Sequence, residues 1–161
     1  MTGSKSAYWL ALIIPSALLG GALISEHVFG LYPCEMCLWQ RWPHLGAILL
    51  AILALLLRGK GMAQILAALA GLAILASGLI GGFHAGVEYG WWEGLTSCAT
   101  SLGTGDDLLC SIMNAPLVRC DVAPWSLFGI SLAGFNFLFS VGGAMLVFAQ
   151  LAKGRRDAAH G

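Results

Sequence analysis

The sequence predicts an all-α membrane protein, a four-helix transmembrane bundle with a long cysteine-bearing periplasmic loop between its third and fourth helices. Hydrophobic residues make up 58% of the chain and charged residues only 10%, and the mean hydropathy is +0.83. This composition lies far from that of a soluble domain. The 161 residues contain four long apolar stretches, and we expect one membrane domain over residues 1–161.

The four spans are expected at about residues 8–29, 36–57, 62–83 and 127–152. A helix needs about 20 residues to cross the hydrocarbon core, and the first, third and fourth stretches satisfy this directly. The second apolar run is short, so its helix must begin near Cys34. The first stretch is too long for the apolar part of a cleaved signal peptide, and we interpret it as a retained span.

Charge in the connecting segments predicts the orientation, because Lys and Arg are retained on the cytoplasmic side during insertion. Six of the eight basic residues fall on one side, namely Lys5, Arg58, Lys60, Lys153, Arg155 and Arg156. Both termini should therefore be cytoplasmic, including a tail at 153–161 that looks disordered from residue 154 onward. The loop at about 86–125 and all five cysteines should face the periplasm, which places the chain in a bacterial inner membrane.

The second span opens with the tetrapeptide Cys34-Glu35-Met36-Cys37. Pro33 before it suits a helix start, and a helix N-terminus favours the thiolate form of a cysteine. Arg41 follows Cys37 by four residues and shares its helix face, so its cation should also favour the Cys37 thiolate. A disulfide that encloses two residues removes little entropy from the unfolded chain, and a purely structural role is therefore disfavoured. The pair is predicted to be redox-active.

The long loop carries Cys98, Cys110 and Cys120, an odd number that leaves one thiol over. Residues 107–113 can form a short amphipathic helix with Cys110 on its apolar face, where a cysteine behaves as a small hydrophobe. This favours a Cys98–Cys120 pair, but spacing alone cannot decide and the role of Cys110 stays open. At the outer end of the third span, His84 can hydrogen-bond a carbonyl or relay protons.

A zinc site is the main alternative for these thiols. Zinc would need four close ligands, for instance Cys34, Cys37, Cys98 and Cys120, all kept reduced. An oxidising compartment disfavours this, and we expect no metal. A haem-carrying subunit would use His27, His44 and His84. None of these lies mid-membrane facing a partner, and His44 is interpreted as a boundary residue after Pro43.

The chain resembles the DsbB family of disulfide bond formation proteins. The similarity rests on Cys34-Glu35-Met36-Cys37-Leu38-Trp39-Gln40-Arg41 at the head of the second span, on the cysteine-bearing outer loop, and on two further segments before the last span, Arg119-Cys120-Asp121 and Trp125-Ser126-Leu127-Phe128-Gly129. It covers the chain from about residue 8 to residue 152. The Cys-x-x-Cys followed by Arg in a four-span protein carries most of the resemblance.

The resemblance implies a membrane enzyme, a protein-disulfide:quinone oxidoreductase, with ubiquinone or another membrane quinone as cofactor. Cys34 and Cys37 would pass electrons to the quinone, with Cys37 adjoining its ring, and Arg41 and His84 would help to hold it. Cys98 would form the mixed disulfide with a periplasmic thioredoxin-like DsbA-type partner, and Cys120 would relay the electrons to Cys34. Cys110 is an additional loop thiol that departs from the family pattern. The identity of the first loop cysteine, Cys98 or Cys110, is therefore open.

The expected partners are thus the DsbA-type protein, membrane lipid and quinone, without nucleic acid. The nearest rival is a quinone-linked thiol oxidoreductase similar to vitamin K epoxide reductase. In that family the loop pair precedes the Cys-x-x-Cys, whereas here it follows. A structural, metal-binding membrane protein is the alternative from a different class. The sequence leaves open which quinone and which client are used, and the oligomeric state.

Overall fold

The computed structural model describes residues 2–57, 60–95 and 118–159. Within them the chain forms α1 (Thr2–His27), α2 (Glu35–Leu56), α3 (Lys60–Glu88) and α5 (Leu132–Ala159), with a small sheet of β1 (Ser126–Leu127) and β2 (Ile130–Ser131). Each of these four helices is long and apolar enough to cross a membrane. The predicted all-α, multi-pass membrane class is confirmed.

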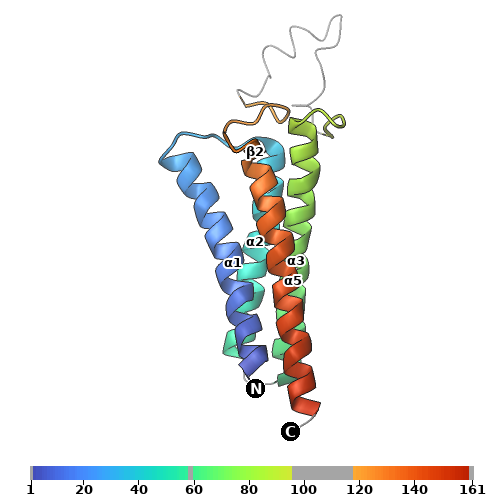
Figure 1. Cartoon of the computed structure of the whole chain (residues 1–161). Coiled ribbons are helices and arrows are strands. Elements are labelled where there is room, and N and C mark those ends of the chain that lie inside the picture. Colours follow the sequence, from blue (N-terminus) through green and yellow to red (C-terminus); the bar gives the residue numbers. More distant parts are fainter. Residues whose placement is uncertain (1, 58–59, 96–117, 160–161) are drawn as a thin grey trace, which may run out of the picture.

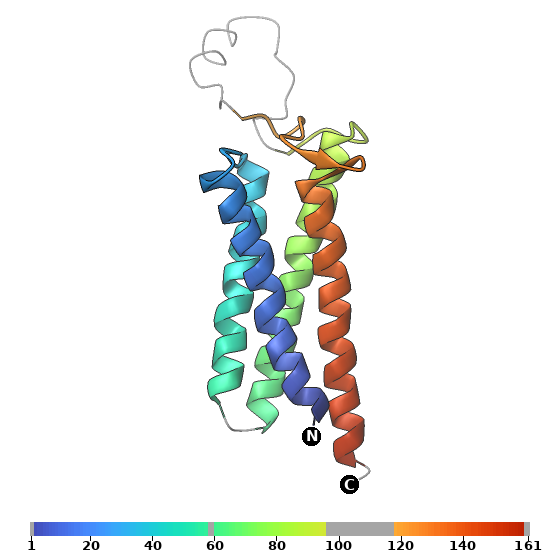
Figure 2. The same cartoon turned by 60° about the vertical axis from the view of Figure 1, so that its left-hand side comes forward.

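The helices form an elongated bundle in which neighbours in space are not always neighbours in sequence (Figures 1 and 2). Helix α3 packs against α2 and α5, and α1 packs mainly against α5 and α2. The two termini lie at one end of the bundle, and the β1–β2 hairpin lies at the other (Figure 1). The segment that links α1 to α2, and with it the Cys-x-x-Cys, is also at the hairpin end.

Alanine dominates the interior between the helices. Fully buried alanines line α1, α2, α3 and α5, and only a few larger side chains complete this core: Ala7, Ala11, Ala47, Ala51, Ala54, Ala63, Ala67, Ala70, Ala144, Ile74, Val147 and Leu151. Small side chains let membrane helices approach closely, so that backbone and side-chain contacts replace the hydrophobic effect as the source of packing. Large apolar residues instead face outward along all four helices, as expected in lipid.

A two-residue hairpin leads into α5. Phe128 and Gly129 connect β1 to β2 with φ angles of 52° and 77°, the left-handed conformation that tight hairpin turns require. The Tyr89 hydroxyl donates to Gly129 O at 3.0 Å and accepts from Ser131 N at 3.1 Å. Ser131 then accepts from Gly134 N through its hydroxyl and caps α5. Tyr89 thus fixes the start of α5 to the end of α3.

Four boundaries differ clearly from the expected ones. Helix α1 begins at Thr2 and not near residue 8. Helix α3 continues past residue 83 to Glu88, which places His84 inside the helix. Helix α5 begins at Leu132 because the hairpin occupies 126–131, and it runs to Ala159 where a disordered tail was expected. Basic residues near a helix C-terminus interact favourably with its dipole, which explains the longer α5. The amphipathic helix expected at 107–113 lies outside the described residues.

Candidate active site

The Cys-x-x-Cys stands at the N-terminus of α2, as the sequence predicts. Cys34 is the N-cap residue in extended conformation, and its sulfur accepts a hydrogen bond from the Cys37 backbone N–H at 3.3 Å. This bond satisfies one of the amides left without a partner at a helix start. Both side chains are thiols, and their Sγ atoms are 3.1 Å apart. The helix start therefore brings the two sulfurs into contact.

The two thiols have different surroundings. Cys34 is buried, with 5% of its surface exposed. The hydrogen bond to the Cys37 sulfur, followed by burial, raises the pKa of Cys34 to about 12, although a hydrogen bond from His84 opposes this rise. Cys34 is therefore protonated at neutral pH. Cys37 is only partly buried and lines a cavity, so the more accessible sulfur of the pair is Cys37.

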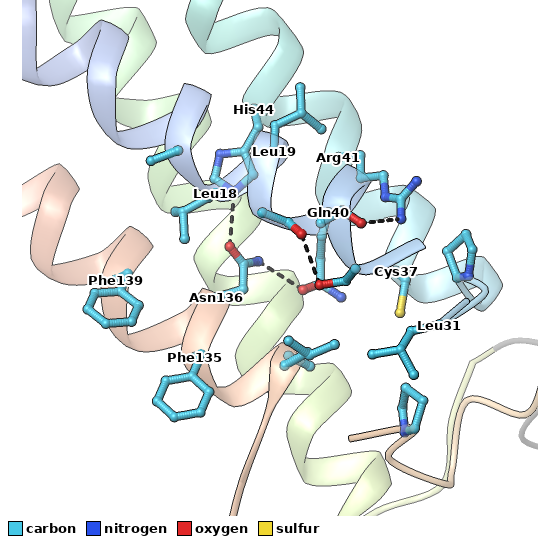
Figure 3. A pocket seen from close by; sticks show the side chains of 18 of the residues that line it. Leu18, Leu19, Leu31, Cys37, Gln40, Arg41, His44, Phe135, Asn136 and Phe139 are labelled. Atoms are coloured by element: carbon cyan, nitrogen blue, oxygen red, sulfur yellow. Dashed lines mark hydrogen bonds between the residues drawn. The ribbon is translucent and has the colours of Figure 1, made fainter. Parts of the chain in front are cut away.

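The cavity has a volume of about 290 Å³ and lies between α1, α2 and α5, with Glu88 of α3 at its edge. Figure 3 shows Cys37, Gln40 and Arg41 along α2, across from Phe135 and Phe139 of α5. Leu18 and Leu19 of α1 complete the apolar part of the wall. The cavity thus has polar and sulfur-bearing groups on α2, further polar groups at Ser25, Glu88 and Asn136, and an apolar lining elsewhere.

Arg41 belongs to this wall together with Cys37, which agrees with the expected shared helix face. Its guanidinium donates to the Glu26 carboxylate at 2.5 Å and to Ala22 O at 3.5 Å, both on α1. Both side chains of the ion pair are about one-fifth exposed. The pair joins α1 to α2 and holds the cation beside the cavity.

A second cluster lies on the other side of Cys34. The potential ligand atoms of Cys34, His84 and Cys120 all lie within 4.8 Å of one another, and all three residues are buried. His84 Nε2 is 3.5 Å from Cys34 Sγ and 3.2 Å from Cys120 O. His84 does not line the cavity. It lies beside the sulfurs and holds the backbone of Cys120 against α3.

Beyond these residues, the structure contains a buried polar network that the sequence interpretation missed. Gln40 Nε2 contacts His84 Nδ1 at 2.9 Å, and Gln40 Oε1 accepts from Asn136 Nδ2 at 2.8 Å. Asn136 Oδ1 in turn is 2.9 Å from His44 Nε2, which also contacts Ser77 Oγ at 2.9 Å. His44 is 3% exposed, so its side chain belongs to the interior of the bundle, and its interpretation as a membrane-boundary residue stays a prediction.

A signal for this network was present in the sequence. Gln40 and His44 are four residues apart and share one helix face, and polar residues inside transmembrane helices usually mark function. Of the predicted site residues, the structure brings together Cys34, Cys37, Arg41, His84 and Cys120 around the end of α2. Cys98 and Cys110 lie outside the described residues, so the pairing of Cys98 with Cys120 stays a prediction.

The loop segment around Cys120 has an ion pair of its own. Arg119 Nε donates to Asp121 Oδ1 at 2.9 Å, and its Nη2 bonds the second carboxylate oxygen. The guanidinium lowers the pKa of Asp121, so both flanking residues stay charged at neutral pH. Charged neighbours keep this segment in water, while the Cys120 side chain between them is buried.

Comparisons with known proteins agree with this geometry. Residues 4–150 match the family described as "Disulfide bond formation protein DsbB". A disulfide bond formation protein B from Verminephrobacter eiseniae is 35% identical over 88% of this chain and 82% of its own length. Disulfide bond formation protein B 2 from Pseudomonas aeruginosa is 30% identical over 91% of this chain and 94% of its own. No solved structure matches the chain.

The family match covers nearly the whole chain, including α2, α3, most of α1 and α5, the Cys-x-x-Cys and Cys120. Membership carries an oxidoreductase role in disulfide bond formation, and that role suits a multi-pass membrane protein whose paired thiols stand beside a third cysteine. This chain belongs to the DsbB family of disulfide bond formation proteins.

Proposed function

We propose that this protein reoxidises a periplasmic DsbA-type protein and passes the electrons through two cysteine pairs to a membrane quinone, ubiquinone or a related one. The observation that carries the proposal is the proximity of three cysteines at one end of the bundle. Cys37 lines a cavity, Cys34 touches Cys37, and Cys120 of the loop approaches Cys34. This order of cysteines suits the transfer of electrons from Cys120 through Cys34 and Cys37 to a molecule bound in the cavity.

The residues of the cavity fit a quinone head group. Ligand pockets usually have about 300–1,000 Å³, so a cavity of about 290 Å³ accommodates one substituted ring. Arg41 supplies N–H donors for a carbonyl oxygen, and Phe135 and Phe139 supply a flat apolar wall. The buried Nδ1 of His44 has no hydrogen-bond partner among the described residues. Cys37 and Arg41 would hold the ring, and the expected part of His84 there stays a proposal.

The first exchange takes place in the loop. A thiolate of the partner attacks Cys98 of a Cys98–Cys120 disulfide, which forms a mixed disulfide and releases Cys120 as a thiolate. The second thiol of the partner then resolves the mixed disulfide and leaves Cys98 reduced. The partner departs with its own disulfide, and two electrons and two protons stay with the loop cysteines.

The second exchange moves these electrons to α2. The Cys120 thiolate attacks Cys34 of a Cys34–Cys37 disulfide, so a Cys34–Cys120 bond forms and Cys37 leaves as a thiolate beside the cavity. Cys98 then attacks Cys120, restores the loop disulfide and releases Cys34. A bound quinone would supply the sink for two electrons and two protons. The approach of Cys120 to Cys34 within 4.8 Å supports this order.

Within these steps His84 has a defined task. Gln40 Nε2 donates to Met36 O at 3.0 Å and contacts His84 Nδ1 at 2.9 Å, so Nδ1 acts as the acceptor. The proton of His84 is then on Nε2, where it faces Cys34 Sγ and Cys120 O. This N–H stabilises a thiolate on Cys34 when the Cys34–Cys120 bond breaks.

The test is quinone reduction by the purified protein in detergent, with a reduced DsbA-type protein as electron donor. We expect the wild type to consume one quinone for each donor disulfide formed. Cys37→Ser and Cys98→Ser should abolish turnover, and Cys110→Ser is the matched control that should retain it. Quinone loss that persists without Cys37 would refute the relay. Loss of turnover with Cys110→Ser and not with Cys98→Ser would reassign the first loop cysteine.

A further inference from the structure

We propose that the reduced protein binds one Zn²⁺ ion, or another thiol-seeking divalent cation, between Cys34, Cys120 and His84. The three residues come from three segments: the N-cap of α2, the loop before β1 and the body of α3. Their ligand atoms lie within 4.8 Å of one another, and none of the residues is more than 5% exposed. The inference concerns the thiol form and needs neither the quinone nor the partner.

The spacing of the donors agrees with tetrahedral zinc. With Zn–S bonds of about 2.3 Å and Zn–N bonds of about 2.0 Å, a tetrahedral ion separates a sulfur from a nitrogen ligand by about 3.5 Å and two sulfur ligands by about 3.8 Å. Cys34 Sγ and His84 Nε2 are 3.5 Å apart. The two sulfurs lie within 4.8 Å of each other, so a small side-chain rotation brings Cys120 to its ligand position.

Glu88 provides an independent sign that a cation belongs here. Its side chain is 2% exposed, and Oε1 is 3.8 Å from His84 Nε2. The other carboxylate oxygen, Oε2, is buried and has no hydrogen-bond partner among the described residues. A buried carboxylate oxygen without a partner is costly. A cation held by the adjacent histidine would offset this cost through its charge.

Gln40 supplies the outer contact that metal-binding histidines normally have. A histidine that binds metal through Nε2 donates its other N–H to a neighbouring acceptor, which fixes the ring. His84 Nδ1 is 2.9 Å from the side-chain amide of Gln40. In the metal form this amide must turn so that its oxygen accepts from Nδ1–H, which breaks the bonds that Gln40 makes with Met36 O and with Asn136 Nδ2. Gln40 thus donates to His84 in the thiol-exchange form and would accept from it in the metal form.

Binding must be limited to the reduced chain. Zinc requires thiolates, so each bound ion displaces the protons of Cys34 and Cys120 and releases two H⁺. A Cys34–Cys37 or Cys98–Cys120 disulfide removes a ligand and excludes the metal. The bound ion would cover the sulfurs that exchange and hold the enzyme in its reduced, inactive state. This consequence for activity rests on the proposed function, whereas the binding itself does not.

The experiment titrates Co²⁺ into full-length protein in detergent, reduced with a non-chelating phosphine and desalted without oxygen. We expect one equivalent to produce a thiolate-to-cobalt charge-transfer band and tetrahedral d–d bands, both removed by one equivalent of Zn²⁺. About two protons should be released for each Zn²⁺ bound. The oxidised protein is the first control and should give no such bands. Equal binding by the oxidised form, or no charge-transfer band in the reduced form, would overturn the proposal.

Variants then identify the ligands. Cys34→Ser, Cys120→Ser and His84→Ala should each abolish the spectrum, while the double variant Cys98→Ser/Cys110→Ser and the exposed histidine variant His27→Ala should keep it. Gln40→Ala should weaken Zn²⁺ binding by about 10- to 100-fold without changing the ligand bands. Circular dichroism confirms that each variant is folded. An unchanged spectrum in Cys34→Ser, or its loss in Cys98→Ser/Cys110→Ser, would refute the assignment.

Discussion

Arg41 is held in place by a residue from another helix. Its ion pair with Glu26 joins α1 to α2 at 2.5 Å, and both side chains are about one-fifth exposed. A cation that must point into a cavity loses rotamer entropy unless something fixes it beforehand. Glu26 therefore acts as a positioning residue for Arg41, and its own contribution should appear in quinone affinity and not in chemistry.

Glu26→Gln should raise the KM for quinone about fivefold and leave kcat nearly unchanged, since a partly exposed ion pair contributes about 1 kcal/mol. Glu26→Asp should restore part of the affinity. Glu35→Gln is the control. It removes an exposed carboxylate at the start of α2, the helix that carries Arg41, and should leave the KM for quinone at its wild-type value. Steady-state kinetics over a range of quinone concentrations separate the effect on KM from the effect on kcat. A fall in kcat alone would show that Glu26 does not act through binding.

Cys34 should be an unreactive thiol as long as Cys37 is present. The pKa of about 12, set first by the Cys37 hydrogen bond and then by burial, lies above the ordinary thiol value of 9.0. Alkylation needs the thiolate, so the initial rate at Cys34 should rise tenfold per pH unit between pH 7 and 10 without a plateau.

In Cys37→Ala the largest cause of the raised pKa is removed, and the pKa of Cys34 should move back towards 9.0. Its alkylation rate at pH 8 should then increase at least tenfold and should level off at a lower pH than in the wild type. Iodoacetamide labelling followed by tandem mass spectrometry separates the two sites. Identical pH profiles in wild type and Cys37→Ala would contradict the assigned cause.

At the scale of elements, glycines determine how closely α3 and α5 approach. A Cβ added at Gly81 would lie 2.9 Å from Asn136 Nδ2 and 3.1 Å from Gln40 Oε1, on either side of the hydrogen bond that joins α2 to α5. A Cβ at Gly142 of α5 would meet nothing within 4 Å. An added methyl group should therefore be tolerated at position 142 of α5 and should cause strain at position 81 of α3.

Gly81→Ala should lower the melting temperature of the detergent-solubilised protein by several degrees, because the substitution separates the helices and strains the Gln40–Asn136 contact. Gly142→Ala is the matched control and should leave stability unchanged or slightly raised, since alanine has the higher helix propensity. Thermal unfolding followed by circular dichroism measures both. Equal effects of the two substitutions would show that helix approach at Gly81 is not tight.

The sequence predicted the helices, but it did not predict the hairpin or the polar network. Apolar length predicted all four helices, and Pro33 with Cys34 located the start of α2, because these signals are local. The β1–β2 hairpin escaped prediction, since it is only two residues per strand and depends on Tyr89 from a distant segment. The polar network escaped for the same reason. Gln40 and Asn136 are far apart in the chain, and only the bundle brings them together.

At the scale of the whole molecule, the bundle is electrically asymmetric. Lys5 near the start of α1 and Lys153, Arg155 and Arg156 at the end of α5 belong to the same end as the two termini (Figure 1). Cys34, Cys37 and Cys120 belong to the opposite end, with the hairpin. Retention of Lys and Arg in the cytoplasm would then orient all described cysteines outward.

This orientation can be measured with two reporters. Green fluorescent protein fused after Gly161 should fluoresce and alkaline phosphatase at the same position should be inactive, because the first folds in the cytoplasm and the second only after export. Fusions after Gly94, beyond α3, should give the reverse pattern. The reverse pattern at Gly161 would place the cysteines in the reducing cytoplasm. Thiols there are held reduced, and the proposed oxidation of a periplasmic partner would then be impossible.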